Sequence, residues 1–320
     1  MEKILTMNQP ILYIVVPCYN EEAMLPLSNE KLTQLLDELV ATREISDKSK
    51  VMYVDDGSRD RTWELICEYA SSGHRVKGVK LAGNSGHQNA LMAGLATAKD
   101  HCDVIVSIDA DLQDDISVIH EMLDKYKSGC DIVYGVRKKR TTDTWFKRNT
   151  ALAFYKIMHG LGVKTVYNHA DYRLMSQRAV EQLCQYRERN LFLRGIVPLL
   201  GYKTDSVYYD RKERVAGESK YPLSKMMNFA ADGITSFSVK PVRLILAAGM
   251  VFILISFLIL IYVLYMYFSH RVVAGWSSLI LSVWFVGGCI LVGLGIIGEY
   301  IGKIYIETKD RPRYNIEEMV

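Results

Sequence analysis

Two long stretches near the C-terminal end of the sequence contain no charged side chain. They are residues 244–268 and residues 276–297, and only the short segment 269–275 separates them. A helix needs about 20 predominantly apolar residues to cross the hydrocarbon core of a bilayer, and each stretch meets that length. Two buried core helices are the alternative, but charge-free runs of this length disfavour it. The sequence therefore predicts a transmembrane hairpin of two helices.

Basic residues lie on the outer flanks of this hairpin rather than in its connecting loop. The loop has Arg271 as its single lysine or arginine. The flanks carry Lys240, Arg243, Lys303, Lys309, Arg311 and Arg313. Because lysine and arginine concentrate on the cytoplasmic side of a membrane, we expect a cell membrane crossed twice, with both chain ends in the cytoplasm. The first ten residues, MEKILTMNQP, do not have the pattern of a signal peptide.

The first part of the chain alternates between strand and helix patterns. Apolar, β-branched runs predict strands at 11–16, 51–54, 76–81, 104–108 and 131–135. Helical spacing of apolar residues predicts helices at 32–40, 62–70, 87–98 and 116–126. This alternation predicts an α/β fold with a mostly parallel, doubly wound sheet. We expect a cytosolic domain at 1–220, an amphipathic membrane-interface region at 221–243, the hairpin at 244–300 and a cytosolic tail at 301–320.

Net charge and cysteine content exclude only a few classes of function. The formal net charge of +3 comes without a basic stripe or a zinc-finger pattern, so we expect no nucleic-acid partner. The six cysteines are scattered and include no CxxC pair. In a cytosolic domain such cysteines are typically reduced and structural.

Polar clusters follow each of the five predicted strands. They cover residues 17–22, 55–60, 83–87, 109–114 and 135–137. Each cluster taken singly is also compatible with a turn or a helix cap. In an open α/β sheet, however, ligands bind beyond the carboxyl ends of the strands, where all five clusters fall. We therefore predict a ligand site at this edge.

The cluster Asp109-Ala110-Asp111-Leu112-Gln113-Asp114 is the most informative of the five. Two carboxylates at positions i and i+2 just past a buried strand can converge on one hard cation, and carboxylate oxygens suit Mg²⁺ or Mn²⁺. Such a cation can neutralise a nucleotide diphosphate as it leaves. The alternative is a polar turn that caps the helix expected after Asp114 and Asp115.

Taken in order, the motifs resemble those of a known family. VVPCYNEE, VDDGSRD, LAGNSGHQNA, SIDADLQD and YGVR are similar to the motifs of inverting glycosyltransferase family 2, which has a GT-A fold and includes dolichol-phosphate mannose synthase. DYRLMSQRA, RVAGESKYPLSK and the terminal hairpin resemble more closely the bacterial polyprenyl-phosphate (bactoprenol) glucosyltransferases. The resemblance covers nearly the whole chain.

The resemblance implies roles for the donor side of the site. A nucleotide-sugar pocket would use Pro17, Tyr19, Glu21, Asp55, Asp56, Asn84 and Asp109. Asp109, Asp111 and Gln113 would organise Mg²⁺ or Mn²⁺, with Asp111 the surest ligand. The catalytic set would be Asp109, Asp111, Asp171 and Arg137. An alternative for Asp171 is a pairing with Arg173 or another arginine that fixes a loop.

The acceptor side follows from the chemistry of a polyprenyl phosphate. Its oxygen is already a nucleophile, so the site must mainly position a phosphate, for which arginine is well suited. Acceptor candidates are Arg137, Arg148, Arg194, Arg211, Arg214, Ser219 and Lys220. The loop 211–221 also fits a solvated basic loop attracted to anionic lipid. Segments 145–158 and 221–239 fit either membrane-surface helices or core helices.

We therefore expect a metal-dependent, inverting transferase that moves a sugar from a UDP-sugar to undecaprenyl phosphate. Glucose is the favoured sugar, and UDP-N-acetylglucosamine, UDP-galactose and GDP-mannose remain open as donors. The resemblance suggests a homotetramer. A non-catalytic, membrane-tethered nucleotide-sugar sensor or scaffold is the alternative from another class. A processive polysaccharide synthase is disfavoured because such enzymes carry a QxxRW motif, and none of the four tryptophans here follows an arginine. A transporter is disfavoured because the two predicted spans contain no charged residue to line a path.

Overall fold

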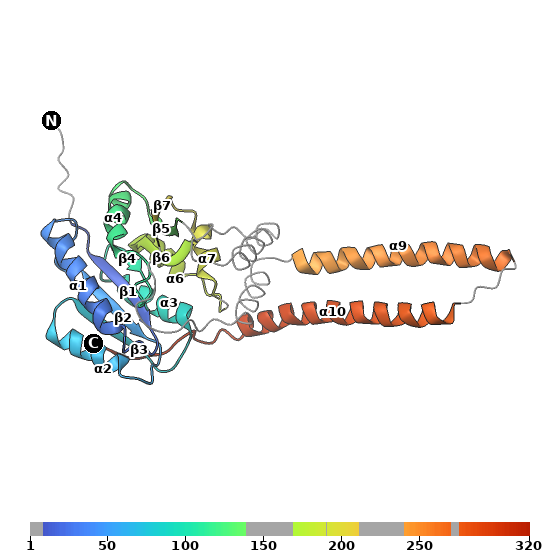
Figure 1. Ribbon diagram of the computed structural model, residues 1–320, viewed down its shortest axis with the longest axis horizontal. Helices are drawn as coiled ribbons and strands as arrows, with labels where there is room; N and C mark the ends of the chain where they lie inside the picture. Colours follow the sequence, from blue (N-terminus) through green and yellow to red (C-terminus); the bar gives the residue numbers. More distant parts are fainter. Residues whose placement is uncertain (1–8, 139–168, 190, 211–239, 270–274) are drawn as a thin grey trace, which may run out of the picture. The chain divides into compact units, whose positions relative to one another are not determined.

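The computed structural model describes residues 9–138, 169–189, 191–210, 240–269 and 275–320 (Figure 1). These residues belong to two compact units, which we describe separately. One unit contains a β-sheet with its flanking helices and includes the C-terminal residues 311–320. The other contains two long helices between residues 240 and 310.

The described part of the sheet unit contains eight strands in the order β7-β5-β6-β4-β1-β2-β3-β8. The strands are β1 (Leu12–Cys18), β2 (Lys50–Asp55), β3 (Val76–Leu81), β4 (Val104–Ser107), β5 (Ile132–Arg137), β6 (His169–Ser176), β7 (Thr204–Tyr209) and β8 (Ile316–Met319). The central pairs are parallel, whereas β6 is antiparallel to β4 and β5, and β8 is antiparallel to β3. The expectation of a mostly parallel α/β sheet is thus confirmed.

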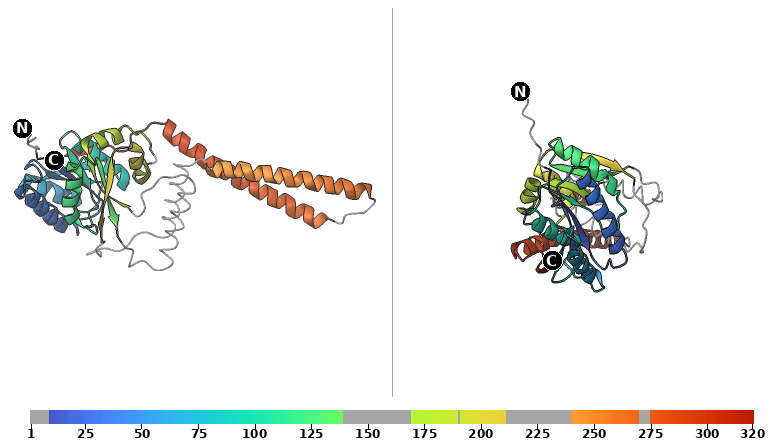
Figure 2. Two further views of the ribbon diagram at one scale, coloured as in Figure 1. Left: turned by 90° about the horizontal axis from the view of Figure 1, so that it is seen from above. Right: turned by 90° about the vertical axis from the view of Figure 1, so that its left-hand side faces the viewer.

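Helices lie on both faces of this sheet (Figure 2). They are α1 (Leu25–Ala41), α2 (Thr62–Ser72), α3 (His87–Ala98), α4 (Ile119–Lys127), α6 (Gln177–Cys184) and α7 (Leu193–Ile196), with 3₁₀ turns at Ile116–Val118 and Val197–Leu200. Side chains alternate between the two faces of a strand. Leu12, Ile14 and Val16 of β1 accordingly share one core with α1, and Val15 contacts α3 on the opposite face.

The last strand, like β6 and β7, is not among the strands that the sequence predicted. We expected residues 301–320 to form a tail, but residues 301–308 continue a helix and 316–319 form the edge strand β8. β8 pairs with β3 at Lys80 and Leu81, and an ion pair joins Lys80 to Glu317 at 3.1 Å. The segment Ile-Glu-Glu-Met lacks a strand-like apolar pattern because this edge strand is exposed on both faces.

The second unit contains α9 (Lys240–Phe268) and α10 (Trp276–Thr308). Their described side chains include many exposed apolar residues, such as Leu254, Phe257, Leu291 and Leu294. Among the described residues, one helical stretch, Phe285–Thr308, has the length and apolar composition needed to cross a membrane. Large exposed apolar surfaces of this kind mark sites of contact with lipid or protein.

Gly94 offers a test of how closely α3 packs on the sheet. A Cβ atom at this position would lie 2.4 Å from a methyl carbon of Val15 and 2.7 Å from one of Val54. The overpacking penalty of about 1–3 kcal/mol exceeds the helix-propensity gain of up to about 1 kcal/mol. We expect Gly94→Ala to lower the thermal unfolding midpoint, measured by tryptophan fluorescence in detergent. The control Gly73→Ala, where a Cβ contacts only a carbonyl oxygen at 3.8 Å, should leave it unchanged. An equal midpoint in both variants would contradict this packing.

Candidate functional site

The loops that follow β1 and β2 interlock at the carboxyl edge of the sheet. The backbone N–H of Asn20 donates to Ser58 Oγ at 2.9 Å, and the N–H of Arg59 donates back to Asn20 Oδ1 at 2.9 Å. The N–H of Glu21 donates to Thr62 Oγ1 at 2.9 Å. Asn20 has a φ of +53°, which an asparagine tolerates better than most residues. These bonds fix the backbone on which the predicted donor residues lie.

The donor residues predicted after β1 differ in their exposure. Pro17 is buried within the strand, and Glu21 is partly buried at the start of the following loop. Tyr19 is 44% exposed, so its ring is available to a ligand. The structure thus places Tyr19 rather than Pro17 at the accessible surface of this edge.

Asp55 and Asp56 have internal partners. The Asp55 carboxylate accepts the backbone N–H of Ser58, and the two oxygens of Asp56 accept those of Ser85 at 2.7 Å and Gly86 at 3.0 Å. The residues are 0% and 3% exposed, respectively. Burial raises the pKa of both carboxyl groups, although the hydrogen bonds from these backbone N–H groups oppose that rise. Asp56 therefore ties the loop after β3 to the end of β2.

The cluster after β4 contains a left-handed residue. Leu112 is buried and has a φ of +47°, a conformation that costs a non-glycine residue of order 1 kcal/mol or more and often occurs at functional sites. The turn brings the N–H of Gln113 to Asp111 Oδ1 at 3.2 Å. The turn at Leu112 thereby joins the Asp111 carboxylate to the backbone of Gln113.

Asp109 faces the amino end of α3. Its Oδ1 lies 3.4 Å from His87 Nε2, and its side chain remains 40% exposed. Desolvation by the surrounding protein raises the pKa of Asp109, the negative charges of Asp171, Asp114 and Asp111 raise it further, and His87 opposes the rise. The three neighbouring carboxylates thus repel the charge of Asp109. A cation at this position would relieve that repulsion.

The donor atoms fit a divalent metal ion. Among the described residues no three histidine, cysteine, aspartate or glutamate side chains are arranged to hold an ion by themselves. Asp109 and Asp111 nevertheless offer carboxylate oxygens on one turn, and Mg²⁺ is commonly held by one or two carboxylates together with phosphate oxygens. Gln113, which is 7% exposed, belongs to the same turn.

Asp171 comes to this edge because β6 runs antiparallel to β4. Its neighbour Arg173 pairs with Ser107 at the end of β4, and Ser107 Oγ donates to the carbonyl oxygen of Asp171 at 2.6 Å. The start of β6 therefore lies beside the end of β4, where the Asp109 cluster begins. Regular strand–helix alternation does not reveal such an antiparallel insertion.

Two guanidinium groups hold the Asp171 carboxylate. Arg173 Nη2 lies 2.6 Å from Oδ1, and Arg194 Nη2 lies 3.1 Å from Oδ2. Although desolvation raises the pKa of Asp171, the opposing charges of Arg194 and Arg173 outweigh it and hold the pKa well below its usual range. Burial lowers the pKa of Arg173, whose side chain is 1% exposed. The desolvation cost of this ion pair therefore falls mainly on the arginine. The predicted alternative, Asp171 paired with arginines, is thus observed.

Arg137 pairs with a carboxylate. Its Nη2 lies 2.9 Å from Asp114 Oδ1, and the hydroxyl of Tyr209 donates to the same oxygen at 2.6 Å. Desolvation lowers the pKa of Arg137, but the charge of Asp114 outweighs it and the net shift is upward. The Arg137 side chain is still 23% exposed. It therefore has a structural partner, and its acceptor role stays a prediction.

The sequence assigns no role to His87 or Gln88 of α3. Arg194, by contrast, is one of the predicted acceptor candidates. Gln88 Oε1 accepts the N–H of Leu193 at 3.0 Å, which joins α3 to α7 beside Arg194. No local signal reveals a contact between residues 105 positions apart.

Several predicted residues and segments lie outside the described residues. They are Arg148, Arg211, Arg214, Ser219, Lys220, the segments 145–158 and 221–239, and Arg271.

Comparisons with known proteins identify the family. The model of glycosyl transferase family 2 matches residues 13–184. The uncharacterized glycosyltransferase YkoT of Bacillus subtilis (strain 168) is 54% identical over 97% of this chain and 92% of its own length. The bactoprenol glucosyl transferase of Shigella phage SfX is 40% identical over 95% of this chain and 98% of its own.

The chain therefore belongs to glycosyl transferase family 2, and it is a glycosyltransferase. Among solved structures, glucosyl-3-phosphoglycerate synthase from Mycobacterium tuberculosis aligns with a TM-score of 0.44 at 18% identity, over 71% of this chain and 78% of that one. A likeness of this degree adds nothing to the assignment.

The buried pair of Asp114 and Arg137 predicts a stability effect. Asp114→Asn removes the charge that compensates Arg137, at a cost of about 2–4 kcal/mol for a partly exposed partner. Each kcal/mol corresponds to about 2–4 °C in the unfolding midpoint of a chain this size. We expect a clearly lower midpoint for Asp114→Asn. Asp100→Asn, which removes an exposed partner of Lys99, should change it little. Equal midpoints would show that the Arg137 pair contributes no stability.

The lowered pKa of Asp171 predicts a pH effect of known sign. The ordinary aspartate pKa of about 3.9 applies to the unfolded chain, and the folded value lies below it. The stability from this carboxylate is therefore fully present above about pH 5 and is lost as the pH falls through the folded pKa. We expect Asp171→Asn to be less stable than the wild type at pH 7. The gap between their unfolding midpoints should narrow below about pH 4; a constant gap down to pH 3 would contradict the assignment.

Proposed function

We propose that this chain transfers a sugar from a UDP-sugar to a polyprenyl phosphate, with inversion at the anomeric carbon and with the help of Mg²⁺ or Mn²⁺. Glucose is the favoured sugar and undecaprenyl phosphate the favoured acceptor. The observation that carries the proposal is the joining of the Asp109–Asp111 turn to the Asp171–Arg194 pair at one sheet edge. The 40% identity to a protein named bactoprenol glucosyl transferase supports the choice of acceptor and sugar.

On the donor side, the carboxylates of Asp109 and Asp111 require a positive charge beside them. Asp109 and Asp111 would hold the metal ion with Gln113 nearby, and the metal would neutralise the diphosphate as it departs. Tyr19 and Glu21 follow β1 at the same edge, and Asn84 is exposed in the loop after β3. Asp55 and Asp56 would act indirectly, because their carboxylates bind the backbone of the loops that the donor would contact.

On the acceptor side, a phosphate oxygen attacks the anomeric carbon, and the bond from that carbon to the UDP oxygen breaks. The phosphate needs no general base, because its oxygen is already ionised near neutral pH. Asp171 is suited to a positioning role rather than to proton abstraction, since its lowered pKa makes it a weak base. We assign it to holding Arg194, whose side chain is 32% exposed, toward the acceptor phosphate.

Further acceptor contacts remain proposals. Arg137 would contribute its exposed part, and Arg148, Arg211, Arg214, Ser219 and Lys220 would extend the phosphate site outside the described residues. We further propose that α9 and α10 form two membrane spans, with the sheet unit and both chain ends in the cytoplasm. A homotetramer remains our expectation for the assembled enzyme.

A lipid-transfer assay tests the proposal directly. Full-length protein in detergent would receive undecaprenyl phosphate, Mn²⁺ and one radiolabelled donor: UDP-glucose, UDP-N-acetylglucosamine, UDP-galactose or GDP-mannose. We expect lipid labelling with UDP-glucose above all others. Labelling with another donor would keep the reaction and change the sugar. No labelling with any donor, despite tight UDP binding, would favour the non-catalytic sensor.

Asp111→Asn separates the metal role from a structural one. The substitution keeps the shape of the side chain but removes the charge that would hold the metal, so we expect transfer to fall at least 100-fold. The unfolding midpoint should stay near that of the wild type. Asp115 is a matched control, because its carboxylate caps the next helical turn through Ser117. Asp115→Asn retains an oxygen that can accept the N–H of Ser117, so it should change stability little and leave transfer intact. Full activity in Asp111→Asn would remove the metal role.

A further inference from the structure

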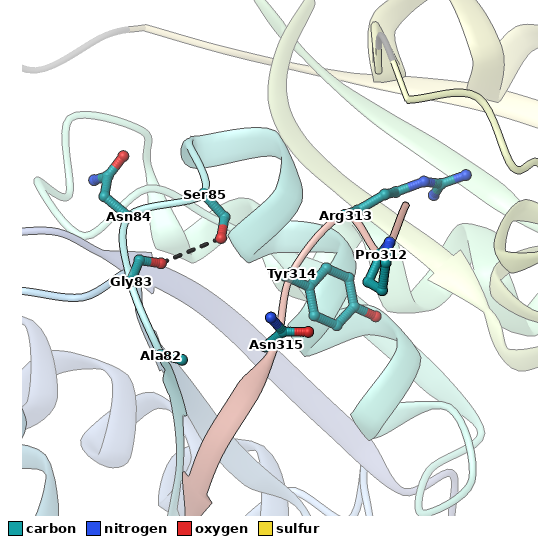
Figure 3. Close-up of a pocket in the computed structure, with 8 residues that line it drawn as sticks. All are labelled: Ala82, Gly83, Asn84, Ser85, Pro312, Arg313, Tyr314 and Asn315. Atoms are coloured by element: carbon teal, nitrogen blue, oxygen red, sulfur yellow. Dashed lines mark hydrogen bonds between the residues drawn. The ribbon is translucent and has the colours of Figure 1, made fainter. Parts of the chain in front are cut away.

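A polar pocket of about 320 Å³ lies between two segments that are far apart in the sequence (Figure 3). One segment, residues 82–85, follows β3, and the other, residues 312–315, leads into β8. The N–H of Ala82 donates to the carbonyl oxygen of Asn315 at 2.9 Å, which joins the two segments at the base of the pocket. Because β8 is antiparallel to β3, its first residues lie at the same sheet edge as the predicted donor loops.

The walls of this pocket suit a flat, neutral ligand with hydrogen-bonding edges. Tyr314 contributes an aromatic ring, while Asn84 and Asn315 contribute amides that both donate and accept hydrogen bonds (Figure 3). None of the lining residues is acidic, and the guanidinium of Arg313 donates to the carbonyl oxygen of Tyr186. Ring stacking together with amide contacts is the common way in which proteins bind single nucleobases.

A short stretch of chain links the pocket to the Asp109 cluster. Asp56 fixes the backbone of Ser85 and Gly86, and the next residue, His87, lies 3.4 Å from Asp109. Ser85 and His87 are two residues apart, which corresponds to at most about 7 Å of chain. A ligand with a base at one end and a diphosphate at the other could therefore reach from the pocket to the Asp109 turn.

Two of the predicted donor residues offer little exposed surface. Asp55 is 0% exposed and Asp56 is 3% exposed, and the carboxylates of both accept backbone N–H groups. The pocket beside Asn84 offers further polar groups at this edge.

We propose that this pocket receives the nucleobase of the donor, with Tyr314 stacking on the base and Asn84 and Asn315 contacting its polar edge. The inference rests on the proposed function, because it assumes a nucleoside diphosphate donor. It adds that residues which follow α10 in the sequence belong to the donor site. The choice between uracil and guanine would then depend partly on the last ten residues of the chain.

Calorimetric binding of two probes tests this inference in the full-length protein in detergent with Mg²⁺. UDP contains the base, and inorganic pyrophosphate lacks it. Stacking of a base on an aromatic ring is worth about 1–3 kcal/mol, so we expect Tyr314→Ala to weaken UDP binding about tenfold or more and to leave pyrophosphate binding unchanged. Tyr314→Phe should retain most of the affinity for UDP.

Two more variants complete the experiment. Asn84→Ala changes an exposed loop residue, so it should leave folding unchanged and weaken UDP binding selectively. Tyr208→Ala is the matched control, because Tyr208 is a 56% exposed tyrosine on β7 at the other edge of the sheet; it should bind both probes normally. Wild-type UDP affinity in both Tyr314→Ala and Asn84→Ala would overturn the inference. Equal weakening of UDP and pyrophosphate would also overturn it, whereas a wild type that binds no nucleoside diphosphate would overturn the proposed function.

Discussion

Concentrated negative charge at one sheet edge is the constraint on which the rest of the site depends. Burial raises the pKa of Asp109 there, and the negative charges of Asp171, Asp114 and Asp111 raise it further. Buried like charges are costly unless they are compensated. Arginines compensate Asp171 and Asp114 through short ion pairs. The partly exposed carboxylate of Asp109 then marks the position at which a metal ion, bound together with a diphosphate, would compensate the remaining negative charge.

The fold supplies this arrangement through two departures from a purely parallel sheet. Antiparallel β6 enters beside β4 and brings Asp171 to the carboxyl edge. Antiparallel β8 pairs with β3 and brings residues 312–315 to the same edge. Hydrogen bonds between successive loops then hold the edge rigid, since Asn20 binds the loop after β2 and Asp56 binds the loop after β3. This edge of the sheet is therefore built from segments at both ends of the sequence.

Sequence reasoning predicted the local features of this design and missed the long-range ones. Apolar β-branched runs predicted β1 to β5, and the polar residues after them were correctly expected at one edge. Motif resemblance identified the family. The Asp171–Arg194 pair joins different elements, and the Arg137–Asp114 pair forms only when β5 lies near the turn after β4, so neither leaves a periodic signal. β8 escaped prediction because its residues are exposed and half of them are acidic.

Mn²⁺ binding measured by electron paramagnetic resonance tests the charge balance most directly. The full-length protein in detergent would be titrated with Mn²⁺ at saturating UDP, and the signal of free Mn²⁺ would give the affinity. The account predicts a bound ion whose affinity falls about tenfold or more in Asp109→Asn and Asp111→Asn, with unchanged affinity in Asp100→Asn. Wild-type affinity in both site variants would contradict the claim that this turn holds the metal.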